Sequence, residues 1–191
     1  IEEAIRRMPK AEMHFHFEGA FRWSTVRELH QRGGELPEAP PWYGRDFAAW
    51  EEFTGVFRDF LKPVTGTPER IERHAFEELE DLARQNVRYV ELIVSHTFHT
   101  AQGMREEEVW EAVVRGRARA EAAYGIRAPL ILGISRDQAP DQEEAVFGQI
   151  AGFALERGWL AGIDLQSDER ARGNAEFAGL YRAAAARGLR L

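Results

Sequence analysis

The stretch MHFHFEG, residues 13–19, places two histidines two positions apart, His14 and His16, and follows them with Glu18 and a glycine. Side chains of a β-strand alternate between its two faces, so a strand here carries the polar side chains on one face and the bulky apolar ones on the other. Two neutral imidazoles at this spacing can bind one zinc ion, each at about 2.0–2.1 Å. The stretch therefore predicts part of a metal site, and hydrogen-bonded core histidines are the alternative that a short H-x-H pattern leaves open.

Strands and helices alternate along the rest of the chain. Runs of β-branched and apolar residues predict strands, and apolar residues that recur at three- and four-residue steps predict helices between them. Strands are expected in the MHFHFEG stretch and at residues 87–95, 128–135 and 159–167. Helices are expected to begin at Thr67, Arg105, Asp141 and Asn174, and residues 189–191 have the pattern of a further strand.

This alternation predicts an α/β fold with a parallel sheet, because strands covered on both faces are apolar along their whole length. A doubly wound sheet usually carries a glycine-rich turn after its first strand, and His-Phe-Glu-Gly-Ala occupies that place here. We therefore expect a TIM-like (β/α)8 barrel. Such barrels take about 250 residues, so we interpret residues 1–191 as one domain that covers roughly the first half of a barrel, up to the start of a fifth strand.

The segment after the first strand is expected to form two helices separated by a loop. The first helix should end at Gly33-Gly34, before a proline-rich loop. Residues 46–61 then resume helical spacing with an unusually aromatic face, on which Phe53, Phe57 and Phe60 recur.

Composition excludes several classes of function. The formal net charge is -7 and the basic residues form no stripe, which argues against a nucleic-acid partner. No apolar run approaches the roughly 18 residues of a membrane span, so we expect no membrane association and a cytoplasmic location. Cysteine is absent, so a transition metal would have to bind to His, Asp and Glu side chains.

Three motifs resemble those of one known family. The stretches MPKAEMHFHFEGA, VRYVELIVS and GIDLQSDE are similar, in this order, to the first-, second- and fourth-strand patterns of the adenosine deaminase branch of the amidohydrolase superfamily. The resemblance runs over essentially the whole chain. It implies a TIM-like barrel, one catalytic zinc ion, and hydrolysis of a 6-aminopurine nucleoside to its 6-oxo product with release of ammonia.

The resemblance also implies roles for individual residues. His14 and His16 match the two first-strand zinc ligands, and Glu18 matches the acidic position that contacts the sugar end of the substrate. Strict adenosine deaminases more usually have Asp at the position of Glu18. Asp164 matches an acid of the fourth-strand motif and is expected near the substrate. Ser167 stands where the family commonly has a glycine whose backbone meets the purine ring, and this departure leaves the substrate open.

Aromatic residues and two further histidines are weaker candidates for the substrate pocket. The helix with Phe53, Phe57 and Phe60 resembles the family's apolar gate over the purine, and ordinary packing against the barrel rim is an equally good interpretation. His96 and His99 follow the second strand on an expected loop, where they would line the pocket or, as loop histidines more often do, lie in solvent.

Two other features are expected to have structural roles. His30 and His74 fall in predicted helices, where we expect surface or packing positions. The acidic run at residues 106–108 opens a helix, and carboxylates there favour the positive end of the helix dipole.

The family completes its site on later strands, with a third histidine and a glutamate in an H-A-G-E motif, another histidine and an aspartate. This sequence ends at Leu191, before any of them, so the general acid is expected beyond that residue. Two protein ligands hold zinc weakly compared with the usual three or four. We therefore expect the 191-residue chain by itself to be inactive.

Several alternatives remain open. Adenosine is the first choice of substrate, and adenine or a 5′-extended adenosine such as aminodeoxyfutalosine is the next. A two-metal or phosphoester amidohydrolase also begins with H-x-H, although the GIDLQSDE motif resembles the deaminases better. A barrel that binds nucleosides without catalysis is the alternative from another class. The zinc deaminases that use H-x-E with P-C-x-x-C are excluded, because the chain has no cysteine.

Overall fold

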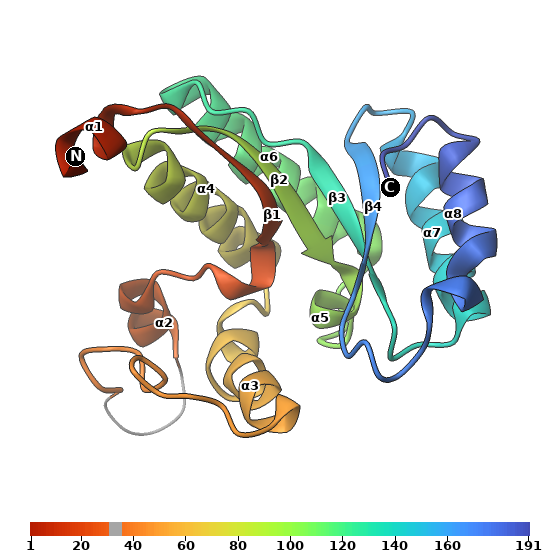
Figure 1. Ribbon diagram of the computed structural model, residues 1–191, viewed down its shortest axis with the longest axis horizontal. Helices are drawn as coiled ribbons and strands as arrows, with labels where there is room; N and C mark the ends of the chain where they lie inside the picture. Colours follow the sequence, from red (N-terminus) through yellow and green to blue (C-terminus); the bar gives the residue numbers. More distant parts are fainter. Residues whose placement is uncertain (31–35) are drawn as a thin grey trace.

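A computed structural model describes residues 1–30 and 36–191 and shows a parallel four-stranded sheet (Figure 1). The strands are β1 (Lys10–His16), β2 (Val87–Ser95), β3 (Leu130–Ser135) and β4 (Leu160–Gln166). They lie side by side in chain order, each parallel to the next. Sequential parallel order is the arrangement of a (β/α) barrel, whereas a doubly wound sheet reverses its strand order. The predicted α/β fold with parallel strands is therefore confirmed.

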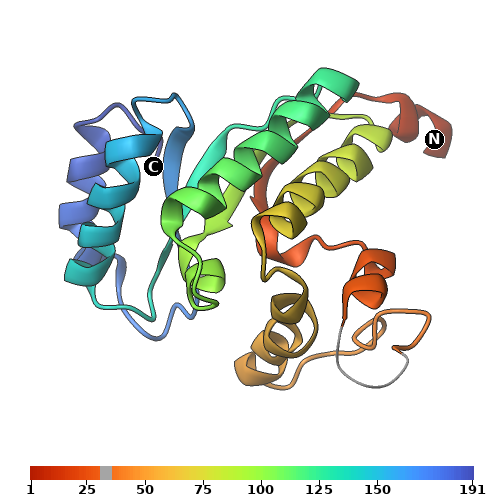
Figure 2. The same cartoon turned by 180° about the vertical axis from the view of Figure 1, so that it is seen from behind.

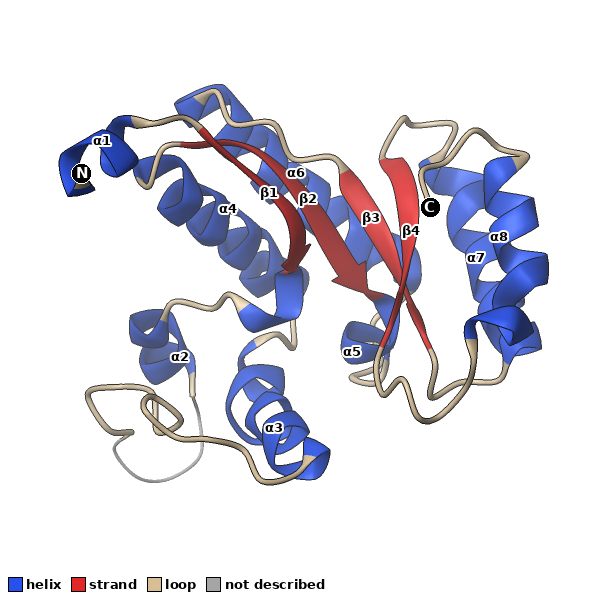
Figure 3. Cartoon of the chain, in the orientation of Figure 1, coloured by secondary structure: helices blue, strands red, loops and turns tan. Residues whose placement is uncertain are grey.

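Helices connect each strand to the next and cover one face of the sheet. The helices are α1 (Glu2–Arg7), α2 (Trp23–Leu29), α3 (Trp50–Val56), α4 (Pro68–Arg84), α5 (His96–Thr100), α6 (Glu106–Tyr124), α7 (Pro140–Ala154) and α8 (Ala178–Ala185). Shorter helical turns are η1 (Phe17–Gly19), η2 (Phe57–Leu61), η3 (Lys62–Val64) and η4 (Asn174–Phe177). Seen from behind, α4 and α6 lie in front of the strands and run along them, and α7 and α8 lie together beside β4 (Figure 2). Figure 3 shows α2, α3 and α5 gathered near the carboxyl ends of β1 and β2.

The main hydrophobic core lies between the sheet and this helical layer. Leu132 of β3, Trp110 of α6 and Phe147 of α7 belong to one cluster of buried side chains, which spans β2 to β4 and the helices behind them. The axes of α4 and α6 approach closely at Gly116, where a Cβ would overlap the backbone oxygen of Glu72. Strands β2, β3 and β4 bury side chains against these helices, so the opposite face of the sheet is the one that can carry a site.

The chain returns to the sheet after α8. Arg190 forms a parallel bridge with Gly162; the Ile163 N–H donates to the Arg190 oxygen, and the Arg190 N–H donates to the oxygen of Ala161, both at 3.0 Å. The predicted start of a fifth strand beside β4 is therefore confirmed. The chain forms four strand-helix units and the first residues of the next.

Strand β1 is less regular than the sequence predicts. Glu12 pairs with Val90 and Phe15 with Leu92, so three residues of β1 advance where two of β2 do, which is a β-bulge. Met13 lies in this bulge and is 58% exposed, whereas Phe17 is fully buried, so the predicted alternation, which puts all the bulky apolar side chains of the stretch on one face, is wrong at Met13.

The segment between β1 and α4 also differs from its prediction. Residues 46–61 do not form one regular helix: α3 begins at Trp50 and widens into the π-helical turn η2, and Pro63 in η3 follows. Proline lacks the N–H that a continuing helix needs, which explains the ending. Helix α2 ends at Leu29, and its predicted end at Gly33-Gly34 lies outside the described residues. No helix in residues 1–30 and 36–191 is long and apolar enough to cross a membrane.

Candidate metal and substrate site

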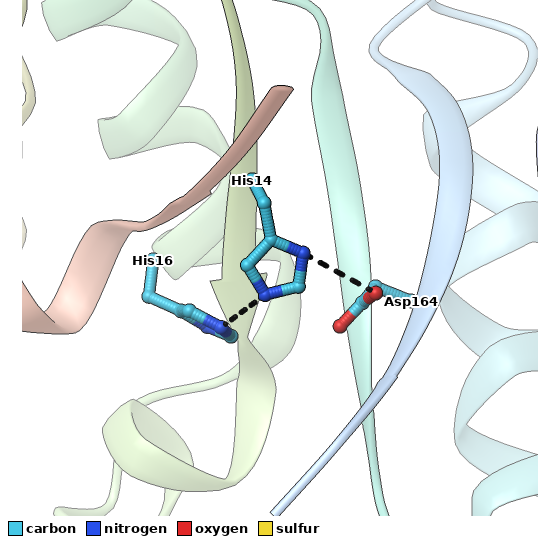
Figure 4. Close-up of side chains that lie close together, drawn as sticks. All are labelled: His14, His16 and Asp164. Atoms are coloured by element: carbon cyan, nitrogen blue, oxygen red, sulfur yellow. Dashed lines mark hydrogen bonds and ion pairs between the residues drawn. The ribbon is translucent and has the colours of Figure 1, made fainter. Parts of the chain in front are cut away.

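His14, His16 and Asp164 come together on the uncovered face of the sheet (Figure 4). The Nε2 atoms of the two histidines are 3.0 Å apart, and His14 Nδ1 is 3.9 Å from Asp164 Oδ1. One ligand atom from each residue lies within 4.8 Å of the others. The three side chains come from β1 and β4, which are not neighbours, so the curvature of the sheet creates this grouping.

A glycine on β3 makes room for a polar side chain on this face of the sheet. Gly133 pairs with Ser95 on β2 and with Asp164 on β4, so it lies on the same face as both. The Gln166 side chain passes over Gly133 and donates to Ser95 Oγ at 2.8 Å, and a Cβ on Gly133 would lie only 2.7 Å from that side chain. A larger residue at position 133 would therefore displace the polar side chains at the carboxyl end of the sheet.

The donor atoms suit a zinc ion. Imidazole nitrogen and carboxylate oxygen are both ordinary zinc ligands, and two nitrogens bound at about 2.0–2.1 Å to a tetrahedral zinc lie about 3.3 Å apart. The observed 3.0 Å between His14 Nε2 and His16 Nε2 is close to that separation. The His14 side chain is 63% exposed and that of Asp164 26%, so an ion can reach them from solvent. The structure brings together the two predicted histidines, and Asp164, which the resemblance puts near the substrate, lies beside His14; the substrate role of Asp164 stays a prediction.

Glu18 lies deeper than its place in the motif suggests. Strand β1 ends at His16, and Glu18 belongs to η1, where it is only 4% exposed. The Ser95 backbone N–H donates to Glu18 Oε1 at 2.8 Å, and His99 Nε2 is 3.2 Å from the same oxygen. The end of the strand therefore turns this carboxylate toward β2 and α5.

His96 and His99 are buried, so the expectation of an exposed loop is wrong. Both belong to α5, which begins directly after β2, and they are 4% and 0% exposed. Both histidines can be buried because they form hydrogen bonds with buried carboxylates. Glu18 is the partner of His99, and Glu106 and Glu143 are the partners of His96.

His96 forms the centre of a buried ionic cluster. Its Nδ1 is 3.2 Å from Glu106 Oε1 at the start of α6, and its Nε2 is 3.3 Å from Glu143 Oε2 in the first turn of α7. Burial lowers the pKa of His96, but hydrogen bonds and charge attraction from the two carboxylates outweigh burial and raise the pKa to about 9. Glu106 therefore does more than favour the helix dipole: it helps to join α5, α6 and α7 behind the site.

His74 and Glu78 form a second buried pair below η1. His74 Nε2 lies 2.7 Å from the backbone oxygen of Phe17, and burial lowers the pKa of His74 to about 3. Glu78 has no hydrogen-bond partner on either carboxylate oxygen among the described residues, and burial followed by the charge of Glu18 raises its pKa well above the ordinary value. The packing role expected for His74 is confirmed, and Glu78 was not singled out from the sequence.

Ser167 adopts a backbone conformation that favours glycine. Its φ is +79°, in the left-handed region, and Asn86 is the other non-glycine residue with positive φ in the described part of the chain. Ser167 Oγ lies 3.1 Å from Ser135 Oγ at the end of β3, and the Asp137 N–H donates to Ser135 Oγ at 3.2 Å. The serine side chain is thus held against β3, in a position where glycine would cause less backbone strain.

The three aromatic candidates divide between two places. The Phe57 ring lies about 4.0 Å from where a Cβ on Gly19 would be, so it covers the exit of β1. Phe53 is 38% exposed and packs edge-on against Phe57, with ring centroids 5.1 Å apart. Phe60 turns away and packs against Trp42 at 5.5 Å. Of these three aromatic residues, Phe57 is therefore the one that contacts the end of the histidine motif, at Gly19.

A surface hollow of about 550 Å³ lies next to Phe60. It is lined by residues between 41 and 60, among them Trp42, Arg58 and Phe60. None of His14, His16 and Asp164 contributes to its lining, so this hollow and the candidate metal site are separate features of the described residues.

Solved structures with the same fold are amidohydrolases. An amidohydrolase from Burkholderia ambifaria with bound Zn matches 98% of this chain and 52% of its own with 30% identity and a TM-score of 0.83. Adenine deaminase from Arthrobacter aurescens matches 95% of this chain and 56% of its own with 26% identity and a TM-score of 0.79. The fold of this chain is thus that of the first part of a TIM-barrel amidohydrolase.

Sequence comparison narrows this class to one family. The family model for adenosine deaminase matches residues 9–191. Adenosine deaminase from Clostridium perfringens (strain SM101 / Type A) is 30% identical over 172 residues, 86% of this chain and 51% of that protein. The Vibrio vulnificus (strain YJ016) enzyme is 32% identical over 146 residues, 73% of this chain and 44% of that protein. The chain belongs to the adenosine deaminase family and spans about half the length of these curated relatives.

Proposed function

We propose that the protein carrying this chain is a zinc-dependent deaminase that hydrolyses a 6-aminopurine nucleoside, with adenosine as the first candidate, to inosine and ammonia. The grouping of His14, His16 and Asp164 at one face of the sheet carries this proposal, because it supplies two histidine ligands for zinc, and a carboxylate beside one of them, in a member of this family. The zinc bound in the Burkholderia ambifaria amidohydrolase supports the choice of metal.

His14 and His16 would hold the metal, and Asp164 would orient His14. The Nε2 atom of His14 faces His16, while its Nδ1 atom faces Asp164 at 3.9 Å. A carboxylate beside the second ring nitrogen of a ligand histidine fixes the ring and its proton, and leaves the first nitrogen free to bind. When bound, zinc supplies Lewis acidity and lowers the pKa of a coordinated water toward about 7.

The substrate would be oriented by groups at the carboxyl ends of β1 and β4. Glu18 would accept a hydrogen bond from the sugar, since one of its oxygens has no protein partner in the described part of the chain. The backbone at Ser167, in its glycine-like conformation, would meet the purine ring. Phe57, with Phe53 packed edge-on against it, would cover the base, whereas Phe60 packs against Trp42 instead. His99 reaches the substrate only through Glu18, and His96 not at all.

The remaining parts of the site would belong to a longer protein. The general acid and further ligands are expected after Leu191, since the chain spans about half the length of its relatives. Adenine and 5′-extended adenosines are the alternative substrates, and the adenine deaminase among the similar structures supports the first of these. A nucleoside-binding barrel without catalysis is the alternative from another class. The cytoplasmic location expected from composition stays a prediction.

A substrate panel on the longest natural chain that contains this sequence tests the proposal. Adenosine, adenine and a 5′-extended adenosine are assayed for ammonia release with zinc restored, next to guanosine and cytidine. We expect turnover of at least one 6-aminopurine and none of guanosine or cytidine. Equal turnover of guanosine or cytidine, or binding of adenosine without any turnover, would contradict the proposal, and the second result would support the binding barrel.

A further inference from the structure

The side chain of His99 is fully buried, and its hydrogen bond goes to Glu18. His99 Nε2 lies 3.2 Å from Glu18 Oε1, and the Ser95 N–H donates to the same oxygen at 2.8 Å. The rings of Phe17 and Phe98 flank His99, with centroid distances of 5.6 and 5.1 Å. One oxygen of Glu18 is therefore held by two donors, one from the end of β2 and one from α5.

The surroundings of His99 select one form of its ring. Nδ1 is buried and has no hydrogen-bond partner among the described residues. A proton on Nδ1 would leave a buried N–H without an acceptor, which is costly. The neutral ring with its proton on Nε2 fits these contacts, and in this form Nε2–H donates to Glu18 Oε1.

The other oxygen of Glu18 is left for a different partner. Oε2 makes no hydrogen bond with any described residue, although the residue as a whole is 4% exposed. Glu18 follows His16 by two positions, so the residue lies just past the carboxyl end of β1, next to the strand that carries His14 and His16. A carboxylate oxygen in this place can accept a hydrogen bond from a hydroxyl group of a bound molecule.

We propose that His99 is a positioning residue: it holds Glu18 Oε1 so that Oε2 accepts a hydrogen bond from a sugar hydroxyl of the substrate. This inference rests on the proposed function, since it assigns a sugar-bearing substrate to the same site. His99 itself touches neither the metal ligands nor the base, so its loss should weaken recognition of the sugar and leave the rest of the site in place.

Two variants of His99 and one of His96 separate positioning from packing. His99→Gln keeps a side-chain N–H donor, whereas His99→Leu keeps the volume among Phe17 and Phe98 and removes the donor. His96→Gln is the matched control, because His96 lies on the same helix and is equally buried but contacts Glu106 and Glu143 instead of Glu18. The variants are made in the longest natural chain, loaded with zinc, and assayed below their melting temperatures.

KM and kcat are measured for adenosine and for adenine, which has no sugar. We expect His99→Leu to raise KM for adenosine about tenfold, with kcat changed much less, because a hydrogen bond to a charged group is lost. KM for adenine should stay within about twofold, and His99→Gln should restore most of the adenosine KM. His96→Gln should lower the melting temperature without changing the ratio of the two KM values.

Crystal structures of the wild type and of His99→Leu give a second readout that does not depend on turnover. We expect Glu18 to leave the Ser95 N–H in the variant and to keep that bond in the wild type. An unchanged Glu18 in the variant, or equal KM changes for adenosine and adenine, would overturn the positioning role. Absence of any wild-type deamination would instead refute the proposed function, and the two structures would still decide whether His99 positions Glu18.

Discussion

His14 Nδ1 lies 3.9 Å from Asp164 Oδ1, although the two residues belong to the first and fourth strands of the sheet. Two strands separate them, and Gly133 on β3, at the level of Asp164, makes room for the Gln166 side chain. The curved sheet therefore brings a carboxylate from β4 to His14, a candidate metal ligand on β1. Carboxylate contacts of this kind raise the affinity of histidine for metals.

Asp164→Asn should weaken zinc binding. Loss of the carboxylate charge beside His14 is expected to lower zinc affinity by about 10–100-fold, the usual effect of removing such a partner. Competition with a chromogenic chelator measures this affinity. Asp168→Asn is the control, since Asp168 follows the same strand but pairs with Arg170 on the surface. Equal zinc affinities for Asp164→Asn and the wild type would contradict the contact.

The ionic cluster of His96 should make the folded protein less stable as the pH rises into the alkaline range. The folded-state pKa of His96 is raised to about 9, above the ordinary 6.5, so protonated His96 stabilises the fold fully below pH 6.5. This contribution, of about 3 kcal/mol, is lost as the pH rises through about 9. Urea unfolding between pH 6 and 10 measures the slope. His96→Gln should remove it, whereas His30→Gln, outside the cluster, should keep it; an equal slope in His96→Gln and the wild type would refute this account.

Backbone strain at Ser167 should make Ser167→Gly and Ser167→Ala differ in stability. Ser167→Gly relieves a left-handed conformation that costs a non-glycine residue about 1 kcal/mol or more, and this gain offsets the lost contact with Ser135. Ser167→Ala loses the contact and keeps the strain. We therefore expect the glycine variant to be more stable than the alanine variant by about 1 kcal/mol in urea unfolding. An alanine variant as stable as the glycine variant would show that position 167 is not strained.

The contact between α4 and α6 should not tolerate a side chain at Gly116. A methyl group there would overlap the Glu72 backbone oxygen and the Ala75 side chain, so Gly116→Ala should lower the free energy of unfolding by about 1–3 kcal/mol. Gly148→Ala is the matched control on α7, where no atom lies within 4 Å of a Cβ. That control should raise stability by about 0.5–1 kcal/mol, through helix propensity. Similar thermal unfolding curves for the two variants would contradict the close helix contact.

The sequence predicts those parts of this site that depend on local pattern. The period of two in MHFHFEG predicts His14 and His16 on one face, and the alternation of strands and helices predicts the parallel sheet. The approach of Asp164 to His14 is not predictable in this way, because it depends on the curvature of a sheet across two intervening strands.

The burial of Glu18, His96 and His99 also could not be predicted from local sequence pattern. Glu18 leaves the alternation because β1 ends at His16, and no periodicity marks that end. His96 and His99 read as loop residues, since the carboxylates that bury them come from three other parts of the chain. Burial of a polar side chain is decided by its partners, and partners distant in sequence leave no local trace.

Zinc dependence of adenosine deamination is the most direct measurement of the central claim. The longest natural chain that contains this sequence is stripped of metal and assayed for inosine formation before and after one equivalent of zinc is added. The wild type should be inactive without metal and recover with zinc, while His14→Ala and His16→Ala should recover little activity and bind little zinc. Full activity of the stripped protein, or full recovery by either histidine variant, would contradict a zinc deaminase built on His14 and His16.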